Sequence, residues 1–264
     1  MSASGRISGP FLKRSLFFVA GVALIILLWE LGHRRYGDLV LPGVAETFAT
    51  LGQMIKSGEV GEALVQTAFN AITGWFFSVG LGVVLGGIAG LWDDFRFMVR
   101  PVSVMLLGVP AIAWVVLALL WFGGRWAVVF TVVVATAPII FASAAQGVRS
   151  LDNDLAHMAR LFRAPTGSMI VDIYGPHMLH HIYPALATTL AMSWKVSIMA
   201  ELLSGSGGIG DGIAAARARV DTAQMIAWIL VVIFILLLLD QVLLRLVRQW
   251  LIVPGAKGAD NEQA

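Results

Sequence analysis

The chain has 264 residues, of which 58% are hydrophobic and 13% are charged, and its mean hydropathy is +0.84. Soluble domains carry roughly 25% charged residues, so a water-soluble fold could not hide this much apolar surface. The chain is therefore expected to be an integral membrane protein. The absence of cysteine excludes disulfides, thiolate metal sites and cysteine nucleophiles. The net charge of +2 is small, so the positions of the basic residues matter more than their sum.

Six apolar stretches are long enough to cross a bilayer, whose hydrocarbon core of about 30 Å takes roughly 20 helical residues. They cover residues 12–31, 64–90, 99–122, 126–146, 178–200 and 225–247. With the N-terminus inside, eleven Lys and Arg residues fall in cytoplasmic segments and six in outside segments. The positive-inside rule then favours both termini in the cytoplasm. The sequence predicts an all-α membrane protein with six transmembrane helices.

The first apolar stretch follows basic residues, as a signal peptide does, but no small-x-small cleavage site comes after it, so it is interpreted as a span. In the outside segment 32–63, Val44, Phe48, Leu51 and Ile55 fall at helical spacing. This spacing predicts an amphipathic helix on the membrane surface. The chain is expected to divide into an N-terminal unit (1–63), a core (64–252) and a cytoplasmic tail (253–264).

Small residues recur every four positions along the second span. They are Gly74, Ser78, Gly82, Gly86 and Gly90. Small side chains at this spacing let two helix backbones approach closely. The sequence predicts a helix-packing ridge here, with no ligand.

Residues 147–177 form a polar island on the predicted cytoplasmic side. Leu155, Met158 and Phe162 share one face of a predicted helix that ends near Pro165. A second short helix is expected to run from there to Gly175–Pro176. Two short amphipathic helices could dock a partner protein or lie on the membrane surface, and the pattern alone favours neither.

The fifth span contains a cation, Lys195, near its predicted outer end. An ionisable side chain at membrane depth is a functional candidate by default, here one that faces a transport pathway and suits an anionic solute. The alternative is that the ammonium snorkels to the outer interface. Glu201 follows at the end of the span and is expected to close the helix or brace the glycine turn after it.

The outside segment 201–224 contains the string LSGSGGIG, whose Gly205, Gly207 and Gly210 match the G-x-G-x-x-G dinucleotide motif. That motif binds pyrophosphate only between a buried strand and a helix, and here a membrane helix precedes it. A Walker A loop is excluded because no lysine in the chain follows a glycine. These glycines and Gly208 are instead expected to supply the positive φ angles of an outer gate loop. Glu201 is expected to belong to the same gate loop.

Four segments carry a resemblance to a known family. They are LPGVAETFATL after the first span, VPAIAWVVLALLWFG at 109–123, SWKVSIMAELLSGSGGIG at 193–210, and the polar island. The first three resemble the L-P, P-x-x-A-W…W-F-G and W…A-E…G-x-G segments of bacterial ABC importer permeases of the nitrate, sulfonate and taurine type. The island resembles the E-A-A loop of these permeases in a diverged form. Anchoring on Pro176 places His157–Met158–Ala159 over E-A-A and Arg163 over the glycine.

The resemblance implies a type I ABC importer permease fold with cytoplasmic coupling helices, in a bacterial inner membrane. It implies no catalytic residue, cofactor or ATPase motif in this chain, with ATP and Mg bound by a cytosolic ABC ATPase dimer. The other implied partners are a periplasmic or lipid-anchored binding protein, a second permease subunit and membrane lipid, with no nucleic acid. The ATPase-coupling residues are expected to be His157, Met158, Ala159, Phe162, Arg163, Ala164, Thr166 and Gly167. The pathway residues are expected to be Lys195, Trp194, Trp114 and Ser197, although for Trp114 the sequence favours packing over lining the pathway.

The predicted function is a permease subunit that moves a small anionic solute. A stand-alone channel or secondary transporter is the alternative, although neither needs the cytoplasmic helix pair and no inverted repeat is visible. A membrane-embedded enzyme is disfavoured because the spans hold no recognisable catalytic pair. The histidines near Pro176 lack an acidic partner at helical spacing, so no metal site is predicted.

Overall fold

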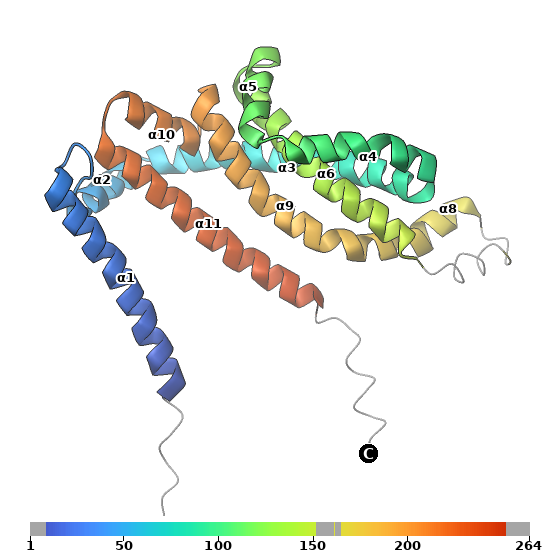
Figure 1. Ribbon diagram of the computed structural model, residues 1–264, viewed down its shortest axis with the longest axis horizontal. Helices are drawn as coiled ribbons and strands as arrows, with labels where there is room; N and C mark the ends of the chain where they lie inside the picture. Colours follow the sequence, from blue (N-terminus) through green and yellow to red (C-terminus); the bar gives the residue numbers. More distant parts are fainter. Residues whose placement is uncertain (1–8, 152–160, 162–164, 252–264) are drawn as a thin grey trace, which may run out of the picture.

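The computed structural model describes residues 9–151, 161 and 165–251, and the described residues form helices and short connections without a strand. Figure 1 shows long helices lying side by side, with α1 projecting away from the others. The helices are α1 (Gly9–Tyr36), α2 (Val44–Lys56), α3 (Glu59–Leu91), α4 (Asp93–Gly108), α5 (Ala111–Trp121), α6 (Gly124–Arg149), α8 (Thr166–Ser168), the π-helix η1 (Met169–Tyr174), α9 (Gly175–Ser204), α10 (Ile209–Ala218) and α11 (Thr222–Leu251). The all-helical prediction is confirmed.

The centre of the fold is a pair of parallel helices, α3 and α6. Gly74 faces Val132 at one end of the pair, and Gly90 faces Val148 at the other, so both helices advance in the same direction. The five small residues of the predicted ridge are all buried or half-buried along this line. A Cβ added at Gly86 would lie 2.5 Å from the carbonyl oxygen of Phe141. The α3 backbone therefore lies against α6 as closely as glycine allows.

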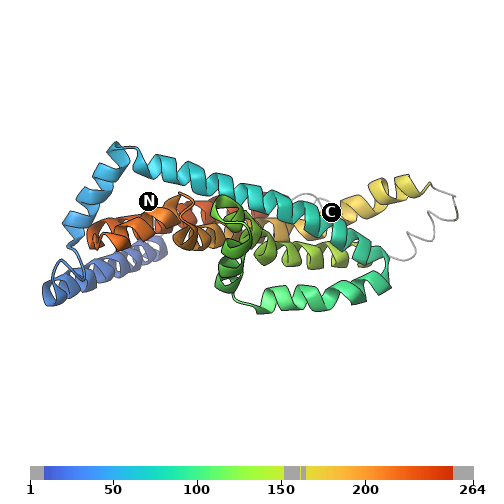
Figure 2. The ribbon, with the colours of Figure 1, turned by 90° about the horizontal axis from the view of Figure 1, so that it is seen from above.

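The third predicted span, 99–122, is not one continuous helix. It consists of α4 and α5, which bend by 101° at a short break. Pro110 has no N–H to continue a helix and forces extended backbone on Val109, whose ψ is 129°. Because α3 and α6 run in the same direction, the chain between them must return along the bundle, and the bent pair makes that return (Figure 2). Among the described residues, five helices are long and apolar enough to span a membrane, or six with this pair counted as one.

The helix break expected at Gly175–Pro176 is absent. Helical backbone runs from Thr166 through η1 into α9, with Pro176 in the first turn of α9. The proline is accommodated inside this continuous helix because it follows the wider π-turn of η1, which leaves room for its ring. The prediction of a separate short helix in this region is therefore wrong for residues 166–176.

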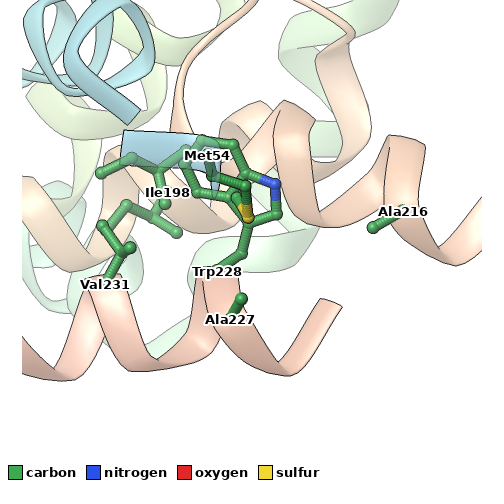
Figure 3. Packing of buried hydrophobic residues seen from close by; sticks show 7 residues of the cluster. Met54, Ile198, Ala216, Ala227, Trp228 and Val231 are labelled. Carbon is green, nitrogen blue, oxygen red and sulfur yellow. The ribbon is translucent and has the colours of Figure 1, made fainter. Parts of the chain in front are cut away.

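The amphipathic helix predicted after the first span exists as α2, and a different face of it packs into the bundle. Phe48 and Ile55 are exposed at 53% and 59%, whereas Thr47 and Met54 are buried. Met54 belongs to a cluster with Ile198, Val231 and Trp228, which Figure 3 shows gathered around the indole ring. Contacts with α9 and α11 hold this face inward, and they leave Phe48 and Ile55 exposed for lipid, in agreement with a helix on the membrane surface.

The first helix is attached to the bundle mainly at its C-terminal end. The Trp29 Nε1–H donates to the carbonyl of Pro42 at 2.9 Å, which fixes the turn into α2. The apolar residues of α1 are otherwise exposed, as expected for a helix surrounded by lipid. The core helix α3 begins at Glu59, before the predicted boundary at residue 64.

Candidate functional site

A buried carboxylate, Glu201, joins three helices at one end of the bundle. The side chain is fully buried near the end of α9. From α3, the Thr67 hydroxyl donates to Oε2 at 2.8 Å and the Asn70 amide donates to Oε1 at 2.9 Å. From α10, the backbone N–H of Gly210 donates to Oε2 at 3.3 Å. One carboxylate therefore ties the α9 terminus to both α3 and the start of α10.

The glycine segment after α9 needs glycine for two different reasons. Gly205, Gly207 and Gly208 have φ angles of 59°, 78° and 94°, in the region that side chains disfavour. Gly208 is also confined by space, because an added Cβ would lie 2.5 Å from Oε2 of Glu201. Gly210 is helical and has no positive φ, so the conformational explanation does not apply to it. It is needed because α10 lies directly on the α9 backbone, and an added Cβ would lie 2.7 Å from Cβ of Glu201.

Two backbone donors of this segment are used within the chain. The N–H of Ile209 donates to Thr67 Oγ1 at 2.9 Å, and that of Gly210 to Glu201. A phosphate cradle works by presenting such N–H groups to its ligand. Here they are used to hold α10 against α3 and α9. The segment is thus built as a braced turn and not as a nucleotide site.

Sequence reasoning singled out Glu201 and the glycines but missed Thr67 and Asn70. Both are fully buried polar residues of α3, on the same side as the small-residue ridge. A polar pair inside an apolar span was the available signal, since such groups must find partners within the bundle. The partner, 131 residues away from Asn70 in the chain, could not be inferred from spacing.

The four predicted pathway residues lie in different surroundings. Trp194 and Ser197 on α9 are buried, Trp114 on α5 is half-buried, and Lys195 is exposed. In the described part of the chain, no carboxylate lies within ion-pair distance of Lys195. The exposed side of α9 continues from Lys195 through Thr188 to Pro184. Lys195 therefore stands on a partly polar strip of a membrane helix, open to a solute, lipid or second subunit.

At the opposite end of the bundle, the helices on either side of the predicted coupling segment are joined by side chains. Ser150, just after α6, has its Oγ 3.1 Å from Nε2 of both His177 and His181 on α9. Arg149 forms an ion pair with Asp93 at the start of α4. Thr166 and Gly167 lie in α8, and Gly167 is exposed. The other predicted coupling residues, His157, Met158, Ala159, Phe162, Arg163 and Ala164, lie outside the described residues.

A family model described as "Binding-protein-dependent transport system inner membrane component" matches residues 78–251, about two thirds of the chain. The chain belongs to this family. The match begins within α3 and ends with α11, so it includes the α3–α6 pair, the bent helices and the braced turn. The chain is accordingly an ABC importer permease subunit, and the predicted family is confirmed.

Curated relatives align with most of the length of this permease. The putative aliphatic sulfonates transport permease SsuC of Bacillus subtilis is 27% identical over 79% of this chain and 77% of its own length. The nitrate import permease NrtB of Synechococcus elongatus is 23% identical over 78% of each chain. The taurine transport system permease TauC of Escherichia coli is 26% identical over 91% of this chain and 90% of its own.

The permease also resembles a solved structure. The match is to the methionine ABC transporter MetNI in an inward-facing conformation, with a TM-score of 0.54 and 19% identity over 71% of this chain and 96% of the other. At this identity the likeness shows the fold, which is that of an ABC importer permease. Among the described residues, no group of three His, Asp or Glu side chains could hold a metal ion.

Proposed function

We propose that this permease lines the translocation pathway for a small anionic solute, delivered by a periplasmic binding protein and driven by a separate cytosolic ATPase dimer. Family membership supports the importer role. The observation that supports an anionic solute is Lys195, an exposed cation on a membrane helix without a carboxylate partner among the described residues. Relatives named for sulfonates, nitrate and taurine agree with this charge preference.

The ATPase is proposed to dock on residues 152–176, with both termini of the permease in the cytoplasm. This segment connects α6 to α9, and Ser150 with His177 and His181 holds the two helix ends together. A movement of the docked segment would therefore shift α6 and α9 as a unit. Because α9 also carries Lys195 and Glu201, the same shift would reach the proposed pathway and the braced turn. ATP would drive transport by binding one arrangement of the complex better than the other.

A second copy of the permease is proposed to complete the pathway. The exposed side of α9 has no covering element in the described chain, although it carries Lys195. A lysine at the centre of a bilayer costs about 2.5–3.5 kcal/mol on insertion scales, less near an interface, so an aqueous pathway between two subunits is a favourable location for it. The outer glycine turn would then close or open the pathway on the periplasmic side.

The partner proposal is tested by expressing the full chain together with a cytosolic ABC ATPase and a binding protein from the same organism. We expect the ATPase to co-purify with the permease after gentle extraction, and reconstituted vesicles to take up solute only with ATP and binding protein present. Uptake by the permease alone, with no ATPase bound, would contradict the importer assembly and favour a channel or secondary transporter.

The charge preference is tested with Lys195→Ala. Removing the cation is expected to reduce anion uptake by the reconstituted complex at least tenfold, because about 1.4 kcal/mol of lost attraction already corresponds to a factor of ten. Lys56→Ala, which removes another lysine at the end of α2, is the matched control and should transport normally. Co-purification of the ATPase should be unchanged in both. Normal uptake by Lys195→Ala would remove the argument for an anionic solute.

A further inference from the structure

A groove with a cationic end and apolar walls lies between α4 and α6. Its volume is about 580 Å³, and three arginines gather at one end of it: Arg96 and Arg100 from α4 and Arg149 from α6. Figure 2 shows α4, in green, lying along the outer side of the α3–α6 pair, with α5 turning away from it. The groove therefore lies on the periphery of the protomer, at the end of the bundle near Ser150.

Within residues 9–151 and 165–251, only one carboxylate forms ion pairs with these arginines. Asp93 forms ion pairs with Arg149 and, at 3.4 Å, with Arg96, so one carboxylate serves two guanidinium groups. Arg100 has no carboxylate within ion-pair distance in the described part of the chain. The Nε–H of Arg96 is buried and has no acceptor. Among the described residues, the groove end thus carries three positive charges, one paired carboxylate (Asp93) and an unused hydrogen-bond donor.

Beyond the arginines the groove becomes apolar. Val104 and Leu107 follow Arg96 and Arg100 along α4, and Phe141 and Ala142 face them from α6. Eleven residues separate Arg96 from Leu107, a helical rise of roughly 16 Å. That is about half of a 30 Å hydrocarbon core. A second cavity of about 190 Å³ adjoins the first, shares Ser103, Pro138 and Phe141 with it, and is also walled by apolar side chains.

We propose that this groove binds an anionic phospholipid, with the phosphate at Arg96, Arg100 and Arg149 and an acyl chain along Val104, Leu107 and Phe141. A phosphate oxygen is an acceptor for guanidinium donors and restores the charge balance. A free anion would satisfy the arginines but leave the apolar length of the groove empty. An acidic protein surface would do the same. Only a phospholipid combines an anionic phosphate with an acyl chain that reaches about as far as one leaflet.

The test uses the purified full-chain complex with its ATPase and measures lipid binding by native mass spectrometry in the presence of dioleoyl phosphatidylglycerol or dioleoyl phosphatidylcholine. The unmodified complex should retain phosphatidylglycerol preferentially. Arg96→Gln with Arg100→Gln should weaken its binding about 30-fold, since each basic residue near an anionic membrane surface contributes about one factor of five. The charge-matched control is Arg34→Gln with Arg35→Gln in the last turn of α1, away from the groove. This control should bind phosphatidylglycerol normally.

A second variant separates a lipid from a free anion. Ala142→Phe fills the apolar wall and keeps all three arginines, so it should abolish lipid retention, whereas Ala113→Phe on the exposed side of α5 should not. Inorganic phosphate should fail to displace the lipid at millimolar concentration. Lipid binding unchanged in Ala142→Phe, or ready displacement by phosphate, overturns the proposal in favour of a free-anion site. Loss of the ATPase from the double arginine variant, with lipid retention intact in Ala142→Phe, overturns it in favour of a protein contact.

Discussion

Replacing Glu201 with leucine is expected to lower the free energy of unfolding by about 3 kcal/mol, the largest effect of any single change considered. The substitution leaves three donors without their acceptor, namely the Thr67 hydroxyl, the Asn70 amide and the Gly210 N–H. Each buried unpaired donor costs about 1–3 kcal/mol. For a chain of this size that corresponds to a melting temperature lower by roughly 6–12 °C. This decrease in melting temperature is measured by thermal unfolding of the purified permease in detergent.

The matched variant is Glu201→Gln, which keeps the shape and one of the two acceptor oxygens. Oδ1 of Asn70 is buried without a partner, so an amide flip at Asn70 would let it accept from the new glutamine N–H₂. Glu201→Gln is therefore expected to melt within about 4 °C of the unmodified chain, as a loss near 1 kcal/mol implies. Equal losses in the two variants would show that charge, and not hydrogen bonding, holds the turn together.

Replacing Gly86 with alanine is expected to destabilise the chain by about 2 kcal/mol. The new methyl group would lie 2.5 Å from the Phe141 carbonyl oxygen and 2.6 Å from the Ala144 Cβ, and a backbone atom cannot move aside without displacing α6. Overpacking of this kind costs typically about 1–3 kcal/mol. The apparent melting temperature should fall by roughly 4–8 °C.

The adjacent Gly87 provides the control for helix propensity. A Cβ at this position meets only Sδ of Met178, at an ordinary 3.9 Å. Gly87→Ala should therefore be neutral or stabilise the chain by up to about 1 kcal/mol, because alanine is the better helix former. Melting curves that shift in opposite directions would support the close α3–α6 approach, whereas a shared shift would contradict it.

Much of the fold followed from hydrophobic length and small-residue spacing. Five of the six predicted spans match single long helices, since an apolar run of about 20 residues is stable in a bilayer in few other forms. The third span differs because hydropathy averages over Pro110, whereas the backbone bends there. The buried side of α2 could not be predicted for a related reason. In a membrane both the core and the lipid accept apolar side chains, so Phe48 and Met54 are indistinguishable by pattern although only Met54 is buried.

The candidate site was likewise predicted only in part from the sequence. Glu201 and the glycines stood out in the sequence because a carboxylate and a G-x-G-x-x-G string follow directly at the end of a membrane span. Their partners Thr67 and Asn70 did not, because they come from α3, far away in the chain. The three arginines of the groove were counted only as positive-inside residues. Their convergence depends on the packing of α4 against α6.

The sequence by itself determined that this protein is a helical membrane permease of the binding-protein-dependent importer family, because span length, composition and local motifs are properties of contiguous residues. The tertiary structure decided which side of each described helix is buried, that α3 and α6 run in parallel, and that Glu201 braces the glycine turn. These features rest on contacts between residues far apart in the chain. Lipid and protein interior are both apolar, so hydrophobicity cannot distinguish them, and only close packing and buried hydrogen bonds select one arrangement.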